Sequence, residues 1–356
     1  MTADIVGGVW TYALELARAL PQIEFALATM GAPISDEQRS EAAQLRNVTL
    51  FPSTYALEWM DHPWSEVDEA GEWLLGVATK FKPDLIHLNG YAHAVLPWDA
   101  PMIVVAHSCV LSWWSAVKKF NAPREYNEYR RRVSDGLNAA DLVVAPTAAM
   151  LESLRSNYDW FGEGSVIFNA REPRLFAPRK KRNSIFAAGR LWDEAKNLAA
   201  LEAVALRVSW SIEVAGDAAH PNGKTREFKH VHSLGRLSSA ELAARLGTSA
   251  IYALPARYEP FGLSVVEAAL SGCALVLGHI ASLREVWGDA ALFVDPDDHD
   301  ALAGTLSHLI EDKARRTDLA QRARWRALEF SPSKMADAYR GAYRDCLRQY
   351  HKDVAA

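Results

Sequence analysis

The most constraining feature of the sequence is the segment 259–278, which reads EPFGLSVVEAALSGCALVLG. Short apolar runs rich in strand-forming residues lie just before it, at 250–254, and near its end, at 274–277. Apolar residues between these runs recur three and four positions apart, as on one face of a helix: Leu263, Val266 and Leu270. Gly272 then supplies a helix stop. The segment predicts a strand, a loop, a helix and a second strand of a parallel α/β sheet. Its loop lies at the carboxyl end of a strand, where such folds bind ligands.

Two glutamates bracket the start of the predicted helix. Glu259 precedes Pro260, which disfavours a helical conformation, so this acid lies in the loop, whereas Glu267 lies roughly one turn into the helix. Backbone N–H groups between the acids form a helix N-terminus, which is a ready anion site. These groups belong to about Phe261, Gly262, Leu263, Ser264 and Val265.

Acids that flank an anion site suit a ligand with hydroxyls on both sides of its phosphates, such as a nucleotide sugar. Gly262 also removes a side chain where a ligand approaches the backbone closely. The alternative is a solvated loop acid and an exposed helix acid, because carboxylates are mostly exposed. The Pro-Phe-Gly insert, the flanking strands and the glycine stop favour a binding site.

The residues between and after the two acids make the segment specific, and it resembles the Glu-x7-Glu signature of family 4 of the retaining glycosyltransferases. The resemblance covers nearly the whole chain, strongly over 184–298 and more loosely before residue 169. It implies an α/β chain with the GT-B fold. Such a chain has two facing Rossmann-like domains with an interdomain cleft, and a C-terminal helix that crosses back to the first domain.

The expected domains follow from this resemblance. They are a Rossmann-like acceptor-side domain at 1–169, a linker at 170–182, a Rossmann-like nucleotide-sugar donor domain at 183–330 and a crossover helix at 331–356. The prolines and basic residues of the linker predict a solvated connection.

A basic element opens the second expected domain. An apolar strand at 184–188 delivers Gly189 and Arg190 to a loop that continues to Lys196. Arginine binds phosphate oxygens bidentately and lysine acts as a point charge, so these cations suit a diphosphate. The element also resembles the Gly-Arg…Lys donor-phosphate element of the family.

Near the start of the chain, Gly7 and Gly8 precede a helical pattern at 11–20. A glycine turn that feeds a helix is typical of the first loop of a doubly wound domain, although two glycines alone also fit a simple turn. The resemblance implies that this loop lies beside the donor phosphate or sugar and the acceptor. Only six residues precede the turn, so we expect a truncated first strand or a true start upstream of Met1.

His107 follows an apolar strand predicted at 102–106. The carboxyl end of a strand is where α/β sites collect functional groups. The resemblance implies a histidine near the transferred sugar and the acceptor here, whereas a histidine with a purely structural role is the alternative.

Composition narrows the possible partners. The 39 basic and 44 acidic residues give a net charge of −5, so nucleic acid is not an expected partner. Three scattered cysteines fit reduced thiols in a cytoplasmic protein: Cys109, Cys273 and Cys346. No apolar run approaches the ~18–20 residues of a membrane span, and no ligand cluster has metal spacing. We expect no metal and no cofactor, the nucleotide sugar being a co-substrate.

Aromatic and basic residues alternate over 113–132. Trp113 and Trp114 are followed by Lys118, Lys119, Arg124, Arg130, Arg131 and Arg132. Such a segment fits peripheral contact with the inner face of a membrane. It also fits helix packing with a solvated basic side.

These features predict transfer of a sugar from a nucleoside-diphosphate sugar to a glycan, lipid-linked or small-molecule acceptor. Arg190, Lys196 and the helix N-terminus should stabilise the leaving diphosphate, which removes the need for a metal. Glu259 should contact the sugar hydroxyls or the positive charge that develops at the anomeric carbon. Glu267 should hold the ribose hydroxyls.

The resemblance alone adds three expectations. The anomeric configuration is retained, His107 with the Gly7-Gly8 loop completes the sugar and acceptor side, and backbone near Arg236 and Leu237 borders the nucleobase. Two other functions stay open on the same two-domain plan. One is a sugar-nucleotide epimerase or hydrolase, and the other is a non-catalytic nucleotide-sugar-binding protein.

Overall fold

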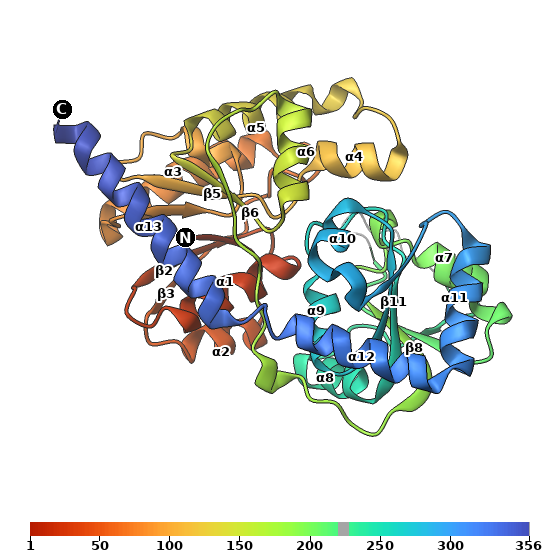
Figure 1. Cartoon of the computed structure of the whole chain (residues 1–356). Helices are drawn as coiled ribbons and strands as arrows, with labels where there is room; N and C mark the ends of the chain where they lie inside the picture. The colour runs from red at the N-terminus through yellow and green to blue at the C-terminus, as the bar shows by residue number, and fades with distance from the viewer. Residues whose placement is uncertain (220–227, 356) are drawn as a thin grey trace. The chain divides into compact units, whose positions relative to one another are not determined.

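The computed structural model describes residues 1–219 and 228–355. The chain divides into two compact units (Figure 1). Unit 1 comprises Met1–Asn169 together with Pro332–Ala356, and unit 2 comprises Ala170–Ser331. The C-terminal helix therefore belongs to the unit that also holds the start of the chain.

Unit 1 contains two parallel sheets. The first has the order β1-β2-β3, with β1 (Thr2–Asp4), β2 (Phe25–Met30) and β3 (Val48–Pro52). The second has the order β4-β5-β6-β7, with β4 (Ile86–Leu88), β5 (Met102–Val105), β6 (Leu142–Ala145) and β7 (Gly164–Val166). The short first strand expected from the sequence is β1, which pairs with β2.

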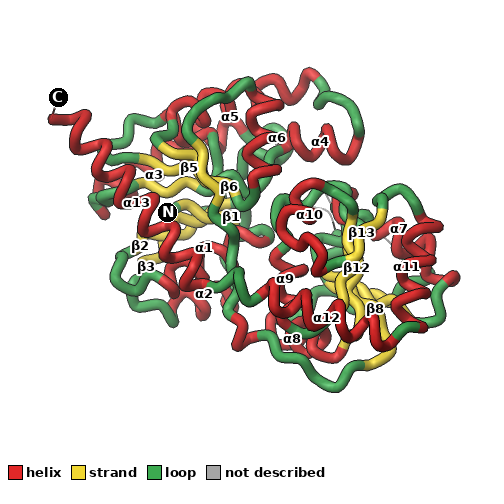
Figure 2. Tube along the Cα trace, viewed as in Figure 1, coloured by secondary structure: helices red, strands yellow, loops and turns green. Residues whose placement is uncertain are grey.

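Helices, drawn red in Figure 2, lie between these strands along the chain, and a last helix of unit 1 follows unit 2. They are α1 (Gly8–Ala19), α2 (Asp36–Ala43), α3 (Trp64–Phe81), α4 (Val110–Lys118), α5 (Asn127–Ala139), α6 (Ala148–Tyr158) and α13 (Pro332–Ala355). Thr147 caps α6, because its hydroxyl accepts a hydrogen bond from the Met150 N–H at 3.1 Å. The helix after the glycine turn begins earlier than predicted, since Gly7 is the N-cap and Gly8 already lies in α1.

The long C-terminal helix α13 lies against α1 (Figure 1). The ring of Tyr339 on α13 is 5.9 Å from the ring of Tyr12 on α1. The Tyr343 hydroxyl is 2.7 Å from Nδ1 of His87 on β4. A buried aromatic cluster thus connects the end of the chain to the helix that follows the Gly7-Gly8 turn.

Unit 2 is built on one parallel sheet with the order β10-β9-β8-β11-β12-β13. Its strands are β8 (Arg182–Ala188), β9 (Ser211–Ala215), β10 (His232–Ser233), β11 (Ser249–Leu254), β12 (Ala274–Gly278) and β13 (Leu292–Val294). Its helices are α7 (Leu198–Val204), α8 (Ser239–Thr248), α9 (Leu263–Leu270), α10 (Ala281–Trp287), α11 (His299–Glu311) and α12 (Lys313–Ala327). The predicted strand–loop–helix–strand segment is β11, its loop, α9 and β12.

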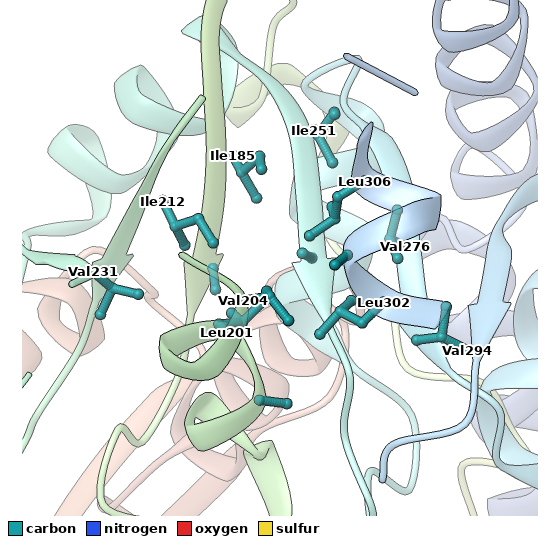
Figure 3. Packing of buried hydrophobic residues seen from close by; sticks show 14 of the residues in the cluster. Ile185, Leu201, Val204, Ile212, Val231, Ile251, Val276, Val294, Leu302 and Leu306 are labelled. Carbon is teal, nitrogen blue, oxygen red and sulfur yellow. The ribbon is translucent and has the colours of Figure 1, made fainter. Parts of the chain in front are cut away.

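The central strands of this sheet are buried on both faces, which explains why they appear in the sequence as continuous apolar runs. On one face, Ile185 and Ile251 pack with Leu201 of α7 and Leu306 of α11 (Figure 3). Successive strand residues point to opposite faces, so Phe186 and Tyr252 lie on the other face.

Most of the linker is solvated as expected, with the basic residues at 179, 180 and 182 exposed, but Lys181 is an exception. Arg182 is the first residue of β8, and Nζ of Lys181 donates hydrogen bonds to the backbone carbonyls of Leu246 and Ser271 at 3.2 and 2.7 Å. The ammonium thus satisfies carbonyls at the C-terminal ends of two helices, α8 and α9. Burial lowers the pKa of this lysine.

The basic run at 118–132 is also less cationic than its sequence implies. Arg131 is paired with Glu128 and Asp135, and Arg132 is paired with Glu128 and Asp68. These acids neutralise the part of the run on α5. Of the helices in residues 1–219 and 228–355, none combines the length and apolarity needed to cross a membrane.

Candidate functional site

The sheet order of unit 2 brings the predicted phosphate-binding elements together. Because β8 lies between β9 and β11, the loops that follow these strands are neighbours at the carboxyl edge of the sheet. The Gly189 N–H donates to the Ala215 carbonyl at 3.1 Å, and the Gly216 N–H donates to the Gly235 carbonyl at 2.9 Å. An added Cβ at Gly216 would lie 1.8 Å from the Gly189 carbonyl oxygen, so only glycine allows this close approach of two loops.

Lys196 and Glu259 form an ion pair at this edge. Their Nζ and Oε2 atoms are 2.5 Å apart, and the side chains are only 14% and 12% exposed. The two loops are also joined by their backbones, because the Arg257 N–H donates to the Ala195 carbonyl at 2.8 Å. The backbone of Glu259 is also held by α10, because the Ser282 hydroxyl donates to the Glu259 carbonyl at 2.6 Å. The predicted lysine and the predicted acid are therefore brought into contact.

Asn197 holds the lysine loop in place and was not predicted as a site residue. It has a left-handed backbone conformation, with φ +53°, which asparagine tolerates better than most residues. Its buried Nδ2 donates to the carbonyls of Pro255 and Pro296 at 2.9 and 2.7 Å. One amide thus ties the loop after β8 to the loops after β11 and β13. The sequence position of Asn197, directly after the expected phosphate-binding lysine, could have indicated its role in holding the loop.

The helix N-terminus after Glu259 is shorter than expected. Gly262, with φ +91°, is the N-cap of α9, and its carbonyl accepts from the N–H groups of both Val265 and Val266. The Val265 N–H, predicted to be available to an anion, is therefore used inside the helix. In the described part of the chain, the N–H groups of Leu263 and Ser264 have no acceptor. The Phe261 side chain is buried, with its ring 5.5 Å from that of Phe330, so only its backbone can face a ligand.

Glu267 is buried and ion-paired with Arg171. The Arg171 Nε and Glu267 Oε1 atoms are 2.7 Å apart, and the two side chains are 10% and 9% exposed. Sequence reasoning placed Arg171 in the linker and missed this contact. The only signal was indirect, because a buried acid requires a cation or several hydrogen bonds.

Arg190 points toward its own loop. Its Nη2 is 3.0 Å from Oδ2 of the buried Asp193, and its guanidinium lies 5.2 Å from the centre of the Trp192 ring. A Cβ added at Gly189 would lie 3.8 Å from the Lys196 Cγ, so the aliphatic stem of the lysine runs past this glycine. Both cations thus belong to the loop that follows β8, but only Lys196 reaches one of the two predicted acids.

Arg236 and Leu237 follow the short strand β10. Arg236 is exposed and Leu237 is half-buried. Their loop is next to the loop after β9, because Gly235 accepts the hydrogen bond from Gly216.

The remaining predicted residues lie in unit 1. Gly7 has φ +110° and starts α1. His107 follows β5, and its Nε2 is 2.8 Å from Oδ1 of Asn89. Burial lowers the pKa of His107 to about 3. The predicted residues are therefore divided between the two units, with Gly7, Gly8 and His107 in unit 1 and the others in unit 2. Within the described ranges, no group of three histidines, cysteines or acids is arranged to hold a metal ion.

The chain has two units of parallel α/β sheet. One of them has a lysine, an acid and a helix N-terminus at the carboxyl edge of its sheet. This combination is typical of a GT-B glycosyltransferase. The structure is similar to sucrose-phosphate synthase from Thermosynechococcus elongatus, with a TM-score of 0.79 at 17% identity over 98% of this chain and 99% of that one. It is also similar to the Anabaena protein HepE, whose structure contains UDP-glucose, with a TM-score of 0.73 at 15% identity over 97% of this chain and 99% of that one. These likenesses confirm the predicted fold.

Sequence comparison defines the family. The model described as Glycosyltransferase Family 4 matches residues 6–197, and the model described as Glycosyl transferases group 1 matches residues 171–326. The chain belongs to glycosyltransferase family 4, as its Glu-x7-Glu segment predicted.

Curated relatives match shorter segments. The MMP alpha-(1->4)-mannosyltransferase of Mycolicibacterium hassiacum is 34% identical over 173 residues, which cover 44% of this chain and 42% of that protein. The glycogen synthase of Mycobacterium tuberculosis is 27% identical over 284 residues, which cover 71% of this chain and 66% of that protein. The chain therefore spans less than two thirds of the length of these relatives.

Proposed function

We propose that the chain transfers a sugar from a nucleoside-diphosphate sugar to a glycan, lipid-linked or small-molecule acceptor, with retention of the anomeric configuration. The observation that carries this proposal is the contact between Lys196 and Glu259 beside the start of α9. The complex of HepE with UDP-glucose and the names of the curated relatives support a nucleotide-sugar donor.

The donor diphosphate binds at the basic loop and the helix N-terminus in this proposal. The Lys196 ammonium has three donor hydrogens, so it contacts phosphate oxygens while it keeps its bond to Glu259. The N–H groups of Leu263 and Ser264 add two donors at the positive end of a helix. These groups stabilise the negative charge that builds on the leaving diphosphate, with Arg190 as a second cation. No metal or cofactor is required for this step.

Glu259 binds the sugar on the opposite side of the lysine. One of its oxygens is held by Lys196, and the carboxylate keeps acceptor capacity for sugar hydroxyls and for positive charge at the anomeric carbon. Glu267 holds the ribose hydroxyls, with Arg171 fixing the orientation of its carboxylate. Arg236 and Leu237 border the nucleobase, and His107 with the Gly7-Gly8 loop serves the sugar and the acceptor.

A panel of nucleotide sugars tests this proposal through thermal unfolding. A ligand that binds only the native state at about 100 times its Kd stabilises by about 2.7 kcal/mol. That stabilisation raises Tm by about 5–10 °C for a unit of this size. We expect one donor class and its nucleoside diphosphate to give this shift in the presence of EDTA. A shift with none of the panel would contradict the proposal.

Product analysis then separates the alternative functions. Transfer requires an acceptor, so mass spectrometry should find the glycosylated acceptor only when both substrates are present. Donor conversion at a similar rate without any acceptor would identify an epimerase or hydrolase. Tight donor binding with no product from any acceptor pool would identify a binding protein.

We also infer that the end of α4 contacts an anionic membrane surface. The Trp114 ring lies 5.8, 5.4 and 5.7 Å from the rings of Trp113, Phe120 and Tyr126, and Phe120 is 57% exposed. Lys118 and Lys119 are next to this aromatic cluster, and the Lys118 ammonium lies 5.6 Å from the centre of the Trp113 ring. Aromatic rings with adjacent lysines match the interface of an anionic bilayer.

Vesicle sedimentation tests this contact. We expect binding to vesicles that contain phosphatidylglycerol and little binding to pure phosphatidylcholine. Each lysine near such a surface contributes about 1 kcal/mol, so changing both Lys118 and Lys119 to glutamine should weaken binding about 30-fold. Arg131→Gln is the matched control, because Arg131 is already neutralised by acids. Equal binding to both kinds of vesicle would contradict a contact based on charge.

A further inference from the structure

His107 is held by a chain of hydrogen bonds that begins at the first strand. Its Nε2 is 2.8 Å from Oδ1 of Asn89, the residue directly after β4. The Asn89 backbone N–H donates to the Thr2 hydroxyl at 2.8 Å, and the Asn89 Nδ2 donates to the Thr2 backbone carbonyl at 2.6 Å. Thr2 lies in β1, so the two neighbouring strand ends fix the asparagine amide.

This chain determines which ring nitrogen of His107 carries hydrogen. The Thr2 carbonyl oxygen only accepts, so the amide nitrogen of Asn89 must face it and the amide oxygen must face His107. The opposite orientation would place two acceptors 2.6 Å apart. Since Oδ1 also only accepts, the His107 Nε2 must be the donor in the 2.8 Å contact.

The neighbours of His107 keep its ring uncharged. Burial holds the pKa of His107 at about 3, so the imidazole is neutral in neutral solution. Tyr12 on α1 lies edge-on to His107 at 4.5 Å between ring centres, and His87 on β4 interacts with it electrostatically. Burial raises the pKa of Tyr12 and lowers that of His87, so neither becomes charged near neutral pH.

A neutral imidazole with hydrogen on Nε2 has a bare lone pair on Nδ1. Among residues 1–219 and 228–355, no group donates to the Nδ1 of His107. His107 as a whole residue is half-buried, so part of its surface is exposed.

We propose that Thr2 and Asn89 are positioning residues that lock His107 in the Nε2–H tautomer, so that its Nδ1 accepts a hydrogen bond from a hydroxyl of the sugar substrate. In this role His107 orients a hydroxyl and donates no proton to the reaction. The tautomer stands on the contacts of unit 1 alone, whereas its use on a substrate hydroxyl rests on the proposed function.

Nitrogen NMR tests the tautomer without any substrate. In protein labelled with ¹⁵N-histidine, the signals of His107 are those that disappear in His107→Phe. At pH 7 we expect the pattern of a neutral ring with the proton on Nε2, and we expect Asn89→Leu to change it to a mixture of the two neutral tautomers. A proton on Nδ1, a charged ring at pH 7, or an unchanged pattern in Asn89→Leu would overturn the lock.

Kinetics test how the lone pair is used. Loss of one hydrogen bond to a neutral group changes kcat/KM by about threefold to tenfold, so we expect a decrease of this size in His107→Phe and in Asn89→Leu. Asn138→Leu on α5 is the control, because this exposed asparagine donates to the Ser134 carbonyl of its own helix. A correct tautomer with unchanged kcat/KM in both site variants would overturn the contact with a hydroxyl. Absence of transfer in the wild type would instead refute the proposed function and leave the NMR result standing.

Discussion

Lys196→Met will lower kcat for sugar transfer by about 10²–10³-fold, the usual effect of removing one preorganised group that stabilises developing charge. Methionine keeps an unbranched stem of similar length over Gly189 and removes the ammonium that contacts Glu259 at 2.5 Å. The loss should appear mainly in kcat, because negative charge on the leaving diphosphate is greatest in the transition state. Steady-state kinetics with the donor found by thermal shift will measure it.

A second lysine provides the control for this experiment. Lys180 lies in the same unit but is exposed, so Lys180→Met should leave kcat unchanged. Glu259→Gln, which keeps the shape of the acid and removes its charge, should also reduce transfer strongly. Near-normal turnover in both Lys196→Met and Glu259→Gln would eliminate this pair as the centre of the site.

Arg171→Met will destabilise unit 2 by about 3 kcal/mol, because removing one member of a buried ion pair leaves the other charge without its closest partner. Arg171 and Glu267 are 2.7 Å apart, and their side chains are 10% and 9% exposed. Urea unfolding followed by circular dichroism will measure the change. Arg174→Met is the matched control, since Arg174 is 93% exposed and its pair with Glu172 is long, at 3.8 Å.

A double variant distinguishes a broken ion pair from a packing defect. Apolar residues in place of both members of a buried pair are often tolerated, so Arg171→Met with Glu267→Met should recover part of the lost stability. The same double variant should fail to bind the donor, because it lacks the proposed ribose contact. Additive destabilisation by the two changes would contradict the buried-pair explanation.

The local part of the fold could be predicted because each element has its own sequence signal. The β11–α9–β12 segment has apolar runs at its strands, helical spacing of apolar residues between them and a glycine after the helix. Its loop holds Glu259 as expected. Helix α12 was not predicted, because most of its residues are charged or polar. Its buried stripe consists of Leu319, Ala323 and Ala327, which are too small and too few to produce a clear apolar pattern.

The contacts between distant segments could not be predicted in the same way. Lys196 meets Glu259 because β8 and β11 are neighbours in the sheet, and strand order is not encoded in local periodicity. Arg171 and Lys181 appeared to be solvated linker charges, yet one pairs with Glu267 and the other satisfies helix carbonyls. Similarly, nothing in the basic run indicated that Asp68 neutralises Arg132.

The amide of Asn197 has a practical consequence for protein engineering. Its two hydrogen bonds to the carbonyls of Pro255 and Pro296 hold the loops after β8, β11 and β13 in fixed positions relative to one another. A chimaera that imports only the lysine-bearing stretch from another enzyme would lose the match with the other two. Attempts to change sugar preference should therefore transplant all three stretches together.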